Sequence, residues 1–156
     1  MEIRKNKILK IIFIISSIAV VAVLGSVFVN LGMDWFNSLV KPSQWIPNII
    51  IPIMWTIIYG TFGIVLSVWS YREDIPVRII VLLIINGLLN VLWCLIFFTL
   101  KLTFVGNIII ILNLIASIIL FINIYKENRT YAIVTSIYPI WLCLATSLNT
   151  ALWILN

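Results

Sequence analysis

Histidine is absent from the sequence, and only two cysteines and five acidic residues occur among its 156 residues. Because histidine is a common general base, metal ligand and haem ligand, its absence removes the usual candidates for those roles. Cys94 and Cys143 do not form a Cys-x-x-Cys spacing, which excludes a structural zinc site. The sequence therefore predicts no metal site and no required cofactor.

Charge is scarce as well, because charged residues make up 10% of the chain and hydrophobic residues 63%. The charges leave five long uncharged runs, each longer than the roughly 20 residues that cross a bilayer as a helix. The strands of a membrane barrel would alternate, and Ile108 to Leu112 does not. We predict an all-α membrane protein, a single five-helix transmembrane domain over 1–156, with helices at about 8–29, 48–71, 78–100, 103–125 and 131–155.

The basic N-terminus followed by an apolar run also has features of a secretory signal peptide. The run is too long for the hydrophobic part of such a peptide, and no Ala-x-Ala-like cleavage site follows it. We therefore expect a retained first helix.

Basic residues give the chain a net charge of +5. They flank hydrophobic runs and form no basic stripe, so membrane lipid is the expected partner and nucleic acid is not. If the helices alternate in direction, one side of the membrane holds eight of the ten basic residues: Arg4, Lys5, Lys7, Lys10, Arg72, Arg78, Lys126 and Arg129. The positive-inside rule then predicts a multi-pass protein of the plasma (inner) membrane, with its N-terminus cytoplasmic and its C-terminus outside.

The connection at about 30–47 is the one long loop, and it is rich in aromatic residues and proline. One interpretation is an aromatic belt at the membrane interface. The other is an outer lid folded over a cavity between helices.

Aromatic and amide side chains recur at intervals of three and four along the later runs, which places them on single helix faces. Polar groups are costly in lipid, so these faces should point into the bundle. Asn113 and Ser117 are explained by hydrogen bonds between helices. The indoles of Trp55, Trp93 and Trp141 fit either a flat ligand pocket or a packed aromatic core, and periodicity does not separate the two.

Four blocks in order resemble the translocator protein family of bacterial type, also called the tryptophan-rich sensory protein (TspO) or peripheral benzodiazepine receptor family. The blocks are Trp35-Phe36-x-x-Leu39-x-Lys41-Pro42, Pro52-x-x-Trp55-Thr56-x-x-Tyr59, Asn90-x-x-Trp93-x-x-x-Phe97-Phe98 and Tyr138-x-x-Trp141-x-x-x-Ala145-x-x-Leu148-Asn149-x-x-x-Trp153-x-x-Asn156. The resemblance covers about 31–156, and the first helix matches only as a hydrophobic span.

The resemblance implies a five-helix bundle, commonly a homodimer, that binds porphyrins such as protoporphyrin, haem or other flat aromatic ligands beneath its first loop. By matched position, the resemblance also implies which residues belong to the lid and which form the wall of the pocket. The ligand-binding residues that we predict are Trp35, Phe36, Pro42, Trp45, Trp55, Tyr59, Asn86, Asn90, Trp93, Tyr138, Trp141 and Ala145.

The chain also departs from the family pattern. Gln44 replaces a tryptophan and Ile46 a proline in the lid, and Pro139 lies two residues past the usual proline, which moves the expected kink. The tail lacks the basic residue of a sterol motif.

Two functions follow from the resemblance. The leading one is a membrane receptor, sensor or transporter for a porphyrin, with a metal-free macrocycle favoured by the lack of histidine. The alternative is light-dependent oxidative degradation of protoporphyrin, in which Trp55 and Trp141 would donate an electron. The membrane part has no Asp, Glu or His for conventional catalysis.

Overall fold

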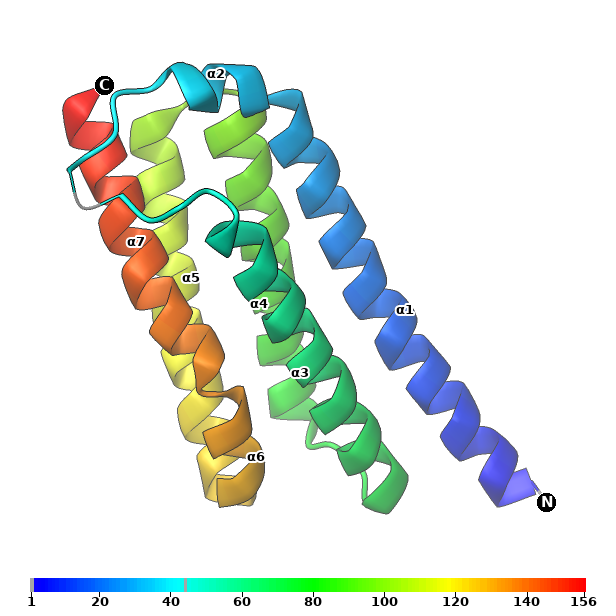
Figure 1. Ribbon diagram of the computed structural model, residues 1–156. Helices are drawn as coiled ribbons and strands as arrows, with labels where there is room; N and C mark the ends of the chain where they lie inside the picture. Colours follow the sequence, from blue (N-terminus) through cyan, green and yellow to red (C-terminus); the bar gives the residue numbers. More distant parts are fainter. Residues whose placement is uncertain (1, 44) are drawn as a thin grey trace.

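The computed structural model describes the backbone of residues 2–43 and 45–156 and the side chains of residues 6–43 and 45–156. Gln44 and the side chains of Arg4 and Lys5, on which some predictions rest, lie outside these ranges. The described chain is helical, without a strand, and runs through α1 (Glu2–Leu31), α2 (Met33–Ser38), α3 (Ile50–Arg72), α4 (Val77–Cys94), a π-helical segment η1 (Leu95–Thr99), α5 (Thr103–Glu127), α6 (Arg129–Thr135) and α7 (Ile137–Leu155) (Figure 1).

Five segments of the described chain are long and apolar enough to cross a membrane: Asn6–Leu31, Ile50–Arg72, Val77–Thr99, Thr103–Glu127 and Arg129–Leu155. The predicted all-α, five-span membrane fold is therefore confirmed. Successive spans alternate in direction, and the two termini lie at opposite ends of the bundle (Figure 1).

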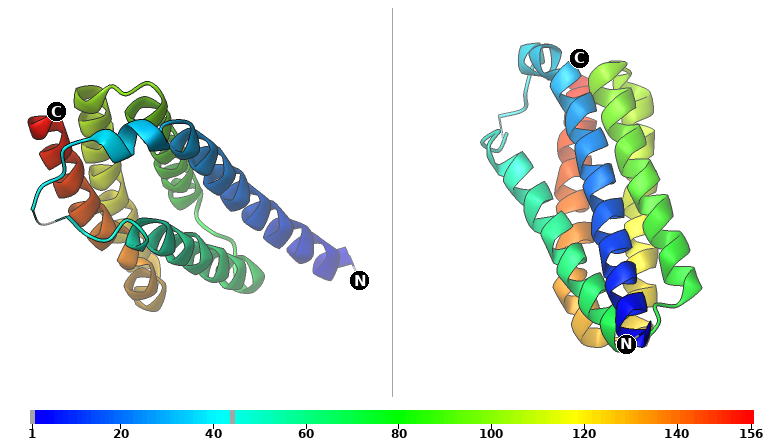
Figure 2. Two further views of the ribbon diagram at one scale, coloured as in Figure 1. Left: turned by 45° about the horizontal axis from the view of Figure 1, so that its top comes forward. Right: turned by 90° about the vertical axis from the view of Figure 1, so that its right-hand side faces the viewer.

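The bundle is held most tightly on one side. α5 packs along both α4 and α7, and α1 packs along α3 and α4. α3 is less enclosed, because it lies mainly against α1, meets α6 at the end away from α2, and touches α7 only lightly. In the right-hand view of Figure 2, α3 leans away from the other helices toward the end that carries α2.

The fifth span is broken into α6 and α7 at Ser136. Pro139 has no N–H to donate to the carbonyl of Thr135, four residues earlier, and its ring crowds that carbonyl. Pro139 is tolerated in the first turn of α7, where Ile140 N donates to Ser136 O at 3.2 Å. The displaced kink expected from Pro139 is thus present as a helix break.

Pro47 and Pro52 lie on either side of the first residue of α3. α3 begins at Ile50, so Pro47 precedes it and its carbonyl accepts from Ile50 N at 2.9 Å. Pro52 then falls in the first turn, where the missing N–H has no intrahelical partner to lose. Pro52 is therefore compatible with the start of α3.

A π-helical turn ends the third span. Leu100 N donates to Leu95 O at 2.9 Å, and Leu102 N donates to Ile96 O at 3.0 Å. Lys101 closes the connection with a φ of 59°, a left-handed conformation uncommon outside glycine. The third and fourth spans are therefore joined by a tight hairpin around Lys101, and Phe97 and Phe98 of η1 are buried in the interior.

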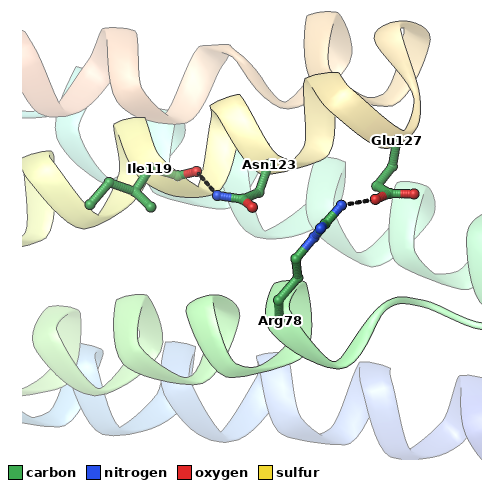
Figure 3. Close-up of polar contacts among 4 residues, drawn as sticks. All are labelled: Arg78, Ile119, Asn123 and Glu127. Atoms are coloured by element: carbon green, nitrogen blue, oxygen red, sulfur yellow. Dashed lines mark hydrogen bonds and ion pairs between the residues drawn. The ribbon is translucent and has the colours of Figure 1, made fainter.

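Ion pairs tie the helices together at the end of the bundle that carries the N-terminus. Lys10 Nζ lies 2.5 Å from Asp74 Oδ1, and the hydrogen bond and charge of Lys10 hold the pKa of Asp74 below its ordinary value. Arg78 at the start of α4 pairs with Glu127 at the end of α5 (Figure 3). Both pairs are exposed, so they orient the helix ends more than they stabilise the fold.

Gly32, between α1 and α2, lies directly against the backbone of η1 at Phe98. A Cβ atom at this position would lie 2.9 Å from Phe98 Cα and closer still to its carbonyl group. Only glycine allows this approach, because the atoms that a side chain would meet belong to rigid backbone.

We expect Gly32→Ala to lower the stability of the protein by about 1–3 kcal/mol, since either α1 or η1 must shift to relieve the overlap. The measurement is thermal unfolding of the purified protein in detergent. Gly60→Ala is the matched control, because a Cβ at Gly60 meets nothing within 4 Å. Equal melting temperatures for the wild type and Gly32→Ala would contradict the contact.

Candidate functional site

The connection between α1 and α3, residues 32–49, forms a lid across one end of the bundle (Figure 1). Phe36 of α2 anchors it: its buried ring lies 5.2 Å from Phe98 and 5.8 Å from Trp45, centroid to centroid. The far side of the lid is held by Asn156, whose Oδ1 accepts from Val40 N at 3.0 Å and whose Nδ2 donates to Val40 O at 3.1 Å. The aromatic loop is thus folded over the helices.

An apolar cavity of about 40 Å³ lies directly under the lid. It is bounded by α3, by α4 with η1, and by α7. Its lining residues are Phe36, Trp45, Ile51, Trp55, Trp93, Phe97, Phe98, Trp141, Ala145, Leu148, Asn149 and Leu152. Pockets for drug-sized ligands usually measure about 300–1,000 Å³, so this conformation is closed around its own aromatic side chains.

Trp55 lies at the centre of the aromatic cluster. Its ring centroid is 5.8 Å from Tyr59, 6.4 Å from Trp93 and 6.3 Å from Tyr138. Trp93 in turn stacks on Phe97 at 6.0 Å. Trp55 therefore lies between the cavity that it lines and the deeper residues Tyr59 and Tyr138.

The twelve predicted ligand-binding residues fall into three groups. Six line the cavity: Phe36, Trp45, Trp55, Trp93, Trp141 and Ala145. Two belong to the lid without lining the cavity, Trp35 and Pro42; the Trp35 ring packs 5.6 Å from Phe97. Four lie deeper than Trp55 or beside it: Tyr59, Asn86, Asn90 and Tyr138.

The deeper group forms a polar layer between helices. Asn90 Nδ2 donates to the Tyr59 hydroxyl at 2.6 Å, and the Tyr138 hydroxyl donates to Asn113 Oδ1 at 3.1 Å. Asn113 thus forms the expected bond between helices, whereas Ser117 donates to Leu114 O in its own helix. In the described part of the chain, several buried atoms of this region have no hydrogen-bond partner: Asn86 Oδ1, Asn90 Oδ1, Asn113 Nδ2 and Trp141 Nε1.

A second set of hydrogen bonds joins α4, α7 and α5 at the cavity wall. Trp93 Nε1 donates to Asn149 Oδ1 at 3.1 Å, and Asn149 Nδ2 donates to Asn107 Oδ1 at 3.3 Å. Thr150 Oγ1 also donates to Asn107 Oδ1, at 2.8 Å. This polar chain fixes the Trp93 ring against the cavity.

Several cavity residues are missing from the predicted set: Ile51, Phe97, Phe98, Leu148, Asn149 and Leu152. Phe97 lies on the same helix face as Trp93, and Asn149 on the same face as Trp141. The spacing of three and four residues that predicts the two tryptophans therefore also predicts Phe97 and Asn149. Phe98 lies in the π-helical segment η1, whose geometry periodicity of an α-helix does not predict. Within the described ranges, no three His, Cys, Asp or Glu side chains gather as metal ligands would.

Comparison with known proteins identifies the bundle. The model of the TspO/MBR family matches residues 13–154. The chain belongs to this family. The resemblance seen in the four sequence blocks is therefore confirmed, and the family match extends through most of α1 as well.

Two relatives match over most of their length. The chain is 29% identical to the Tryptophan-rich protein TspO of Archaeoglobus fulgidus over 151 residues, which cover 96% of this chain and 98% of the relative. It is 27% identical to Protein CrtK of Rhodobacter capsulatus over 128 residues, 78% of each chain.

The polar chain generates a prediction for this family member. Asn149→Ala leaves the Trp93 indole N–H without its acceptor, and we expect a loss of stability of about 0.5–2 kcal/mol, measured by thermal unfolding in detergent. Asn123→Ala is the control, because Asn123 donates to Ile119 O within α5 (Figure 3). Equal melting temperatures for the wild type and both variants would show that the hydrogen bond from Trp93 to Asn149 does not stabilise the fold.

Proposed function

We propose that this protein binds a flat tetrapyrrole of the protoporphyrin class in the cavity beneath the lid, as a membrane receptor, sensor or transporter. One observation carries the proposal: four of the seven tryptophans, Trp45, Trp55, Trp93 and Trp141, surround a single apolar cavity. Indole faces stack well on flat conjugated rings, and such a concentration of them exceeds what packing of a small bundle requires.

The closed cavity must expand to hold a macrocycle. Expansion is easiest at α3, which carries Trp55 and touches α7 only lightly. The buried N–H of Trp141, without an acceptor in the described part of the chain, is available to an acceptor group of the ligand. Because the chain has no histidine to serve as an axial ligand, a metal-free porphyrin suits the site better than haem.

The first test is a titration with protoporphyrin in darkness, followed by tryptophan fluorescence. We expect saturable quenching at micromolar concentration. Trp55→Phe and Trp141→Phe should each weaken binding by about 0.5–1.5 kcal/mol, the size of an aromatic contact. Trp153→Phe is the control, since Trp153 packs on Phe104 away from the cavity. Quenching no greater than that of free tryptophan at the same porphyrin absorbance would refute the site.

The same samples under controlled light distinguish binding from degradation. A protein that only binds should bleach porphyrin no faster than detergent alone does. The degrading enzyme is favoured instead if the wild type bleaches porphyrin faster than detergent alone and Trp55→Phe and Trp141→Phe lose this bleaching but still bind. These two indoles are the candidate electron donors because both line the cavity.

We also propose that the lid end faces outward from the plasma (inner) membrane. Eight of the ten basic residues lie on the ends of α1, α3, α4, α5 and α6 that are opposite the lid (Figure 1). The other two are Lys41 in the lid and Lys101 in the turn between η1 and α5, at the lid end. Basic residues are retained preferentially on the cytoplasmic side.

Reporter fusions test this orientation. We expect alkaline phosphatase fused after Asn156 to be active and a fluorescent protein fused there to be dark after export. The same two reporters fused before Met1 should give the reverse result. A C-terminal reporter that is active only in the cytoplasm would contradict the orientation.

A further inference from the structure

Lys41 of the lid lies beside two rings of the cavity lining, although its own side chain is not part of that lining. Its Nζ is 5.0 Å from the centroid of the Phe36 ring and 5.9 Å from that of the Trp45 ring, and both rings line the cavity. Nζ also donates to the carbonyl of Phe36 at 3.4 Å. The ammonium group is therefore held in one place, over aromatic faces, at the edge of the closed site.

This cation has no anionic partner within residues 6–43 and 45–156. The ion pairs of that part of the chain, Lys10 with Asp74 and Arg78 with Glu127, are at the opposite end of the bundle. Asp34 is the one acidic residue in the lid sequence, and its exposed side chain forms no ion pair there. Lys41 is half-buried, so an anion beside it would gain more than one beside a fully exposed lysine.

We infer that Lys41 pairs with an acid group of the ligand, so that the site selects flat aromatic molecules that carry a carboxylate. This inference rests on the proposed function. The indoles would cover the apolar ring system, while the ammonium, which has three N–H donors and gives one to Phe36, would bind the carboxylate at the edge of the ring.

A lipid phosphate offers the same anionic oxygen chemistry to Lys41, because the lid lies where the bundle meets the headgroups. The two sources are separated by working in a maltoside detergent, which contains no phosphate. A ligand preference measured there belongs to the ligand and not to the lipid.

The experiment compares protoporphyrin, which has two carboxylates, with its dimethyl ester, which has the same macrocycle and no acid. Dissociation constants are measured by tryptophan quenching in maltoside for the wild type, Lys41→Gln, Lys41→Arg and Lys101→Gln. Neither lysine lines the cavity, but Lys41 lies over two rings that do. Lys101 is the matched control, an exposed cation in the turn at the same end of the bundle.

We expect the wild type to bind the diacid about tenfold more tightly than the ester, because one charge-assisted hydrogen bond contributes a difference in affinity of about this size. Lys41→Gln should abolish this preference by weakening the diacid and leaving the ester affinity unchanged. Lys41→Arg and Lys101→Gln should keep the preference of the wild type.

Two results overturn the inference and leave the proposed function standing. One is equal affinity of the wild type for diacid and ester, which assigns Lys41 to the headgroups. The other is an equal loss for both compounds in Lys41→Gln, which makes Lys41 a packing residue of the lid. Failure of the wild type to bind either compound overturns the proposed function together with the inference.

Discussion

The backbone contact between Gly32 and Phe98 sets the position of the whole lid. Because Gly32 has no side chain, the chain leaving α1 passes directly over the carbonyl of η1, and α2 begins there. Phe36 is thereby brought onto Phe98, and Trp45 onto Phe36. The close approach at Gly32 and the hydrogen bonds between Asn156 and Val40 thus fix the lid at two places.

The interior has a more constrained part, formed by α4, α5 and α7, and a less constrained part, formed by α3. α4, α5 and α7 are joined by the chain from Trp93 through Asn149 to Asn107, and a buried polar bond is costly to break in lipid. α3 faces them with aromatic contacts through Trp55, together with the bond from Asn90 to Tyr59. On the proposed function, the cavity of about 40 Å³ would grow by displacement of the lid end of α3.

The five spans were predictable because the hydrophobic runs are local features of the sequence, and the inward stripes because helical periodicity puts Trp93 and Phe97 on one face. The break at Ser136 was foreseen only as a kink from Pro139. The π-helical turn at Leu95–Thr99 was not predictable, since it depends on how η1 meets Gly32 across the bundle. Likewise, periodicity places Trp55 and Trp141 inward without giving the volume left between them.

On the proposed function, a flat ligand enters the cavity under the lid when α3 moves away from α7. The most direct measurement is the distance between spin labels at Ile53 of α3 and Leu144 of α7, both exposed positions, with Cys143 replaced by serine. Pulsed electron resonance should show the distance distribution shifting to longer values when protoporphyrin is added. A distribution that stays unchanged at saturating protoporphyrin, while tryptophan quenching shows that the porphyrin is bound, would contradict the claim.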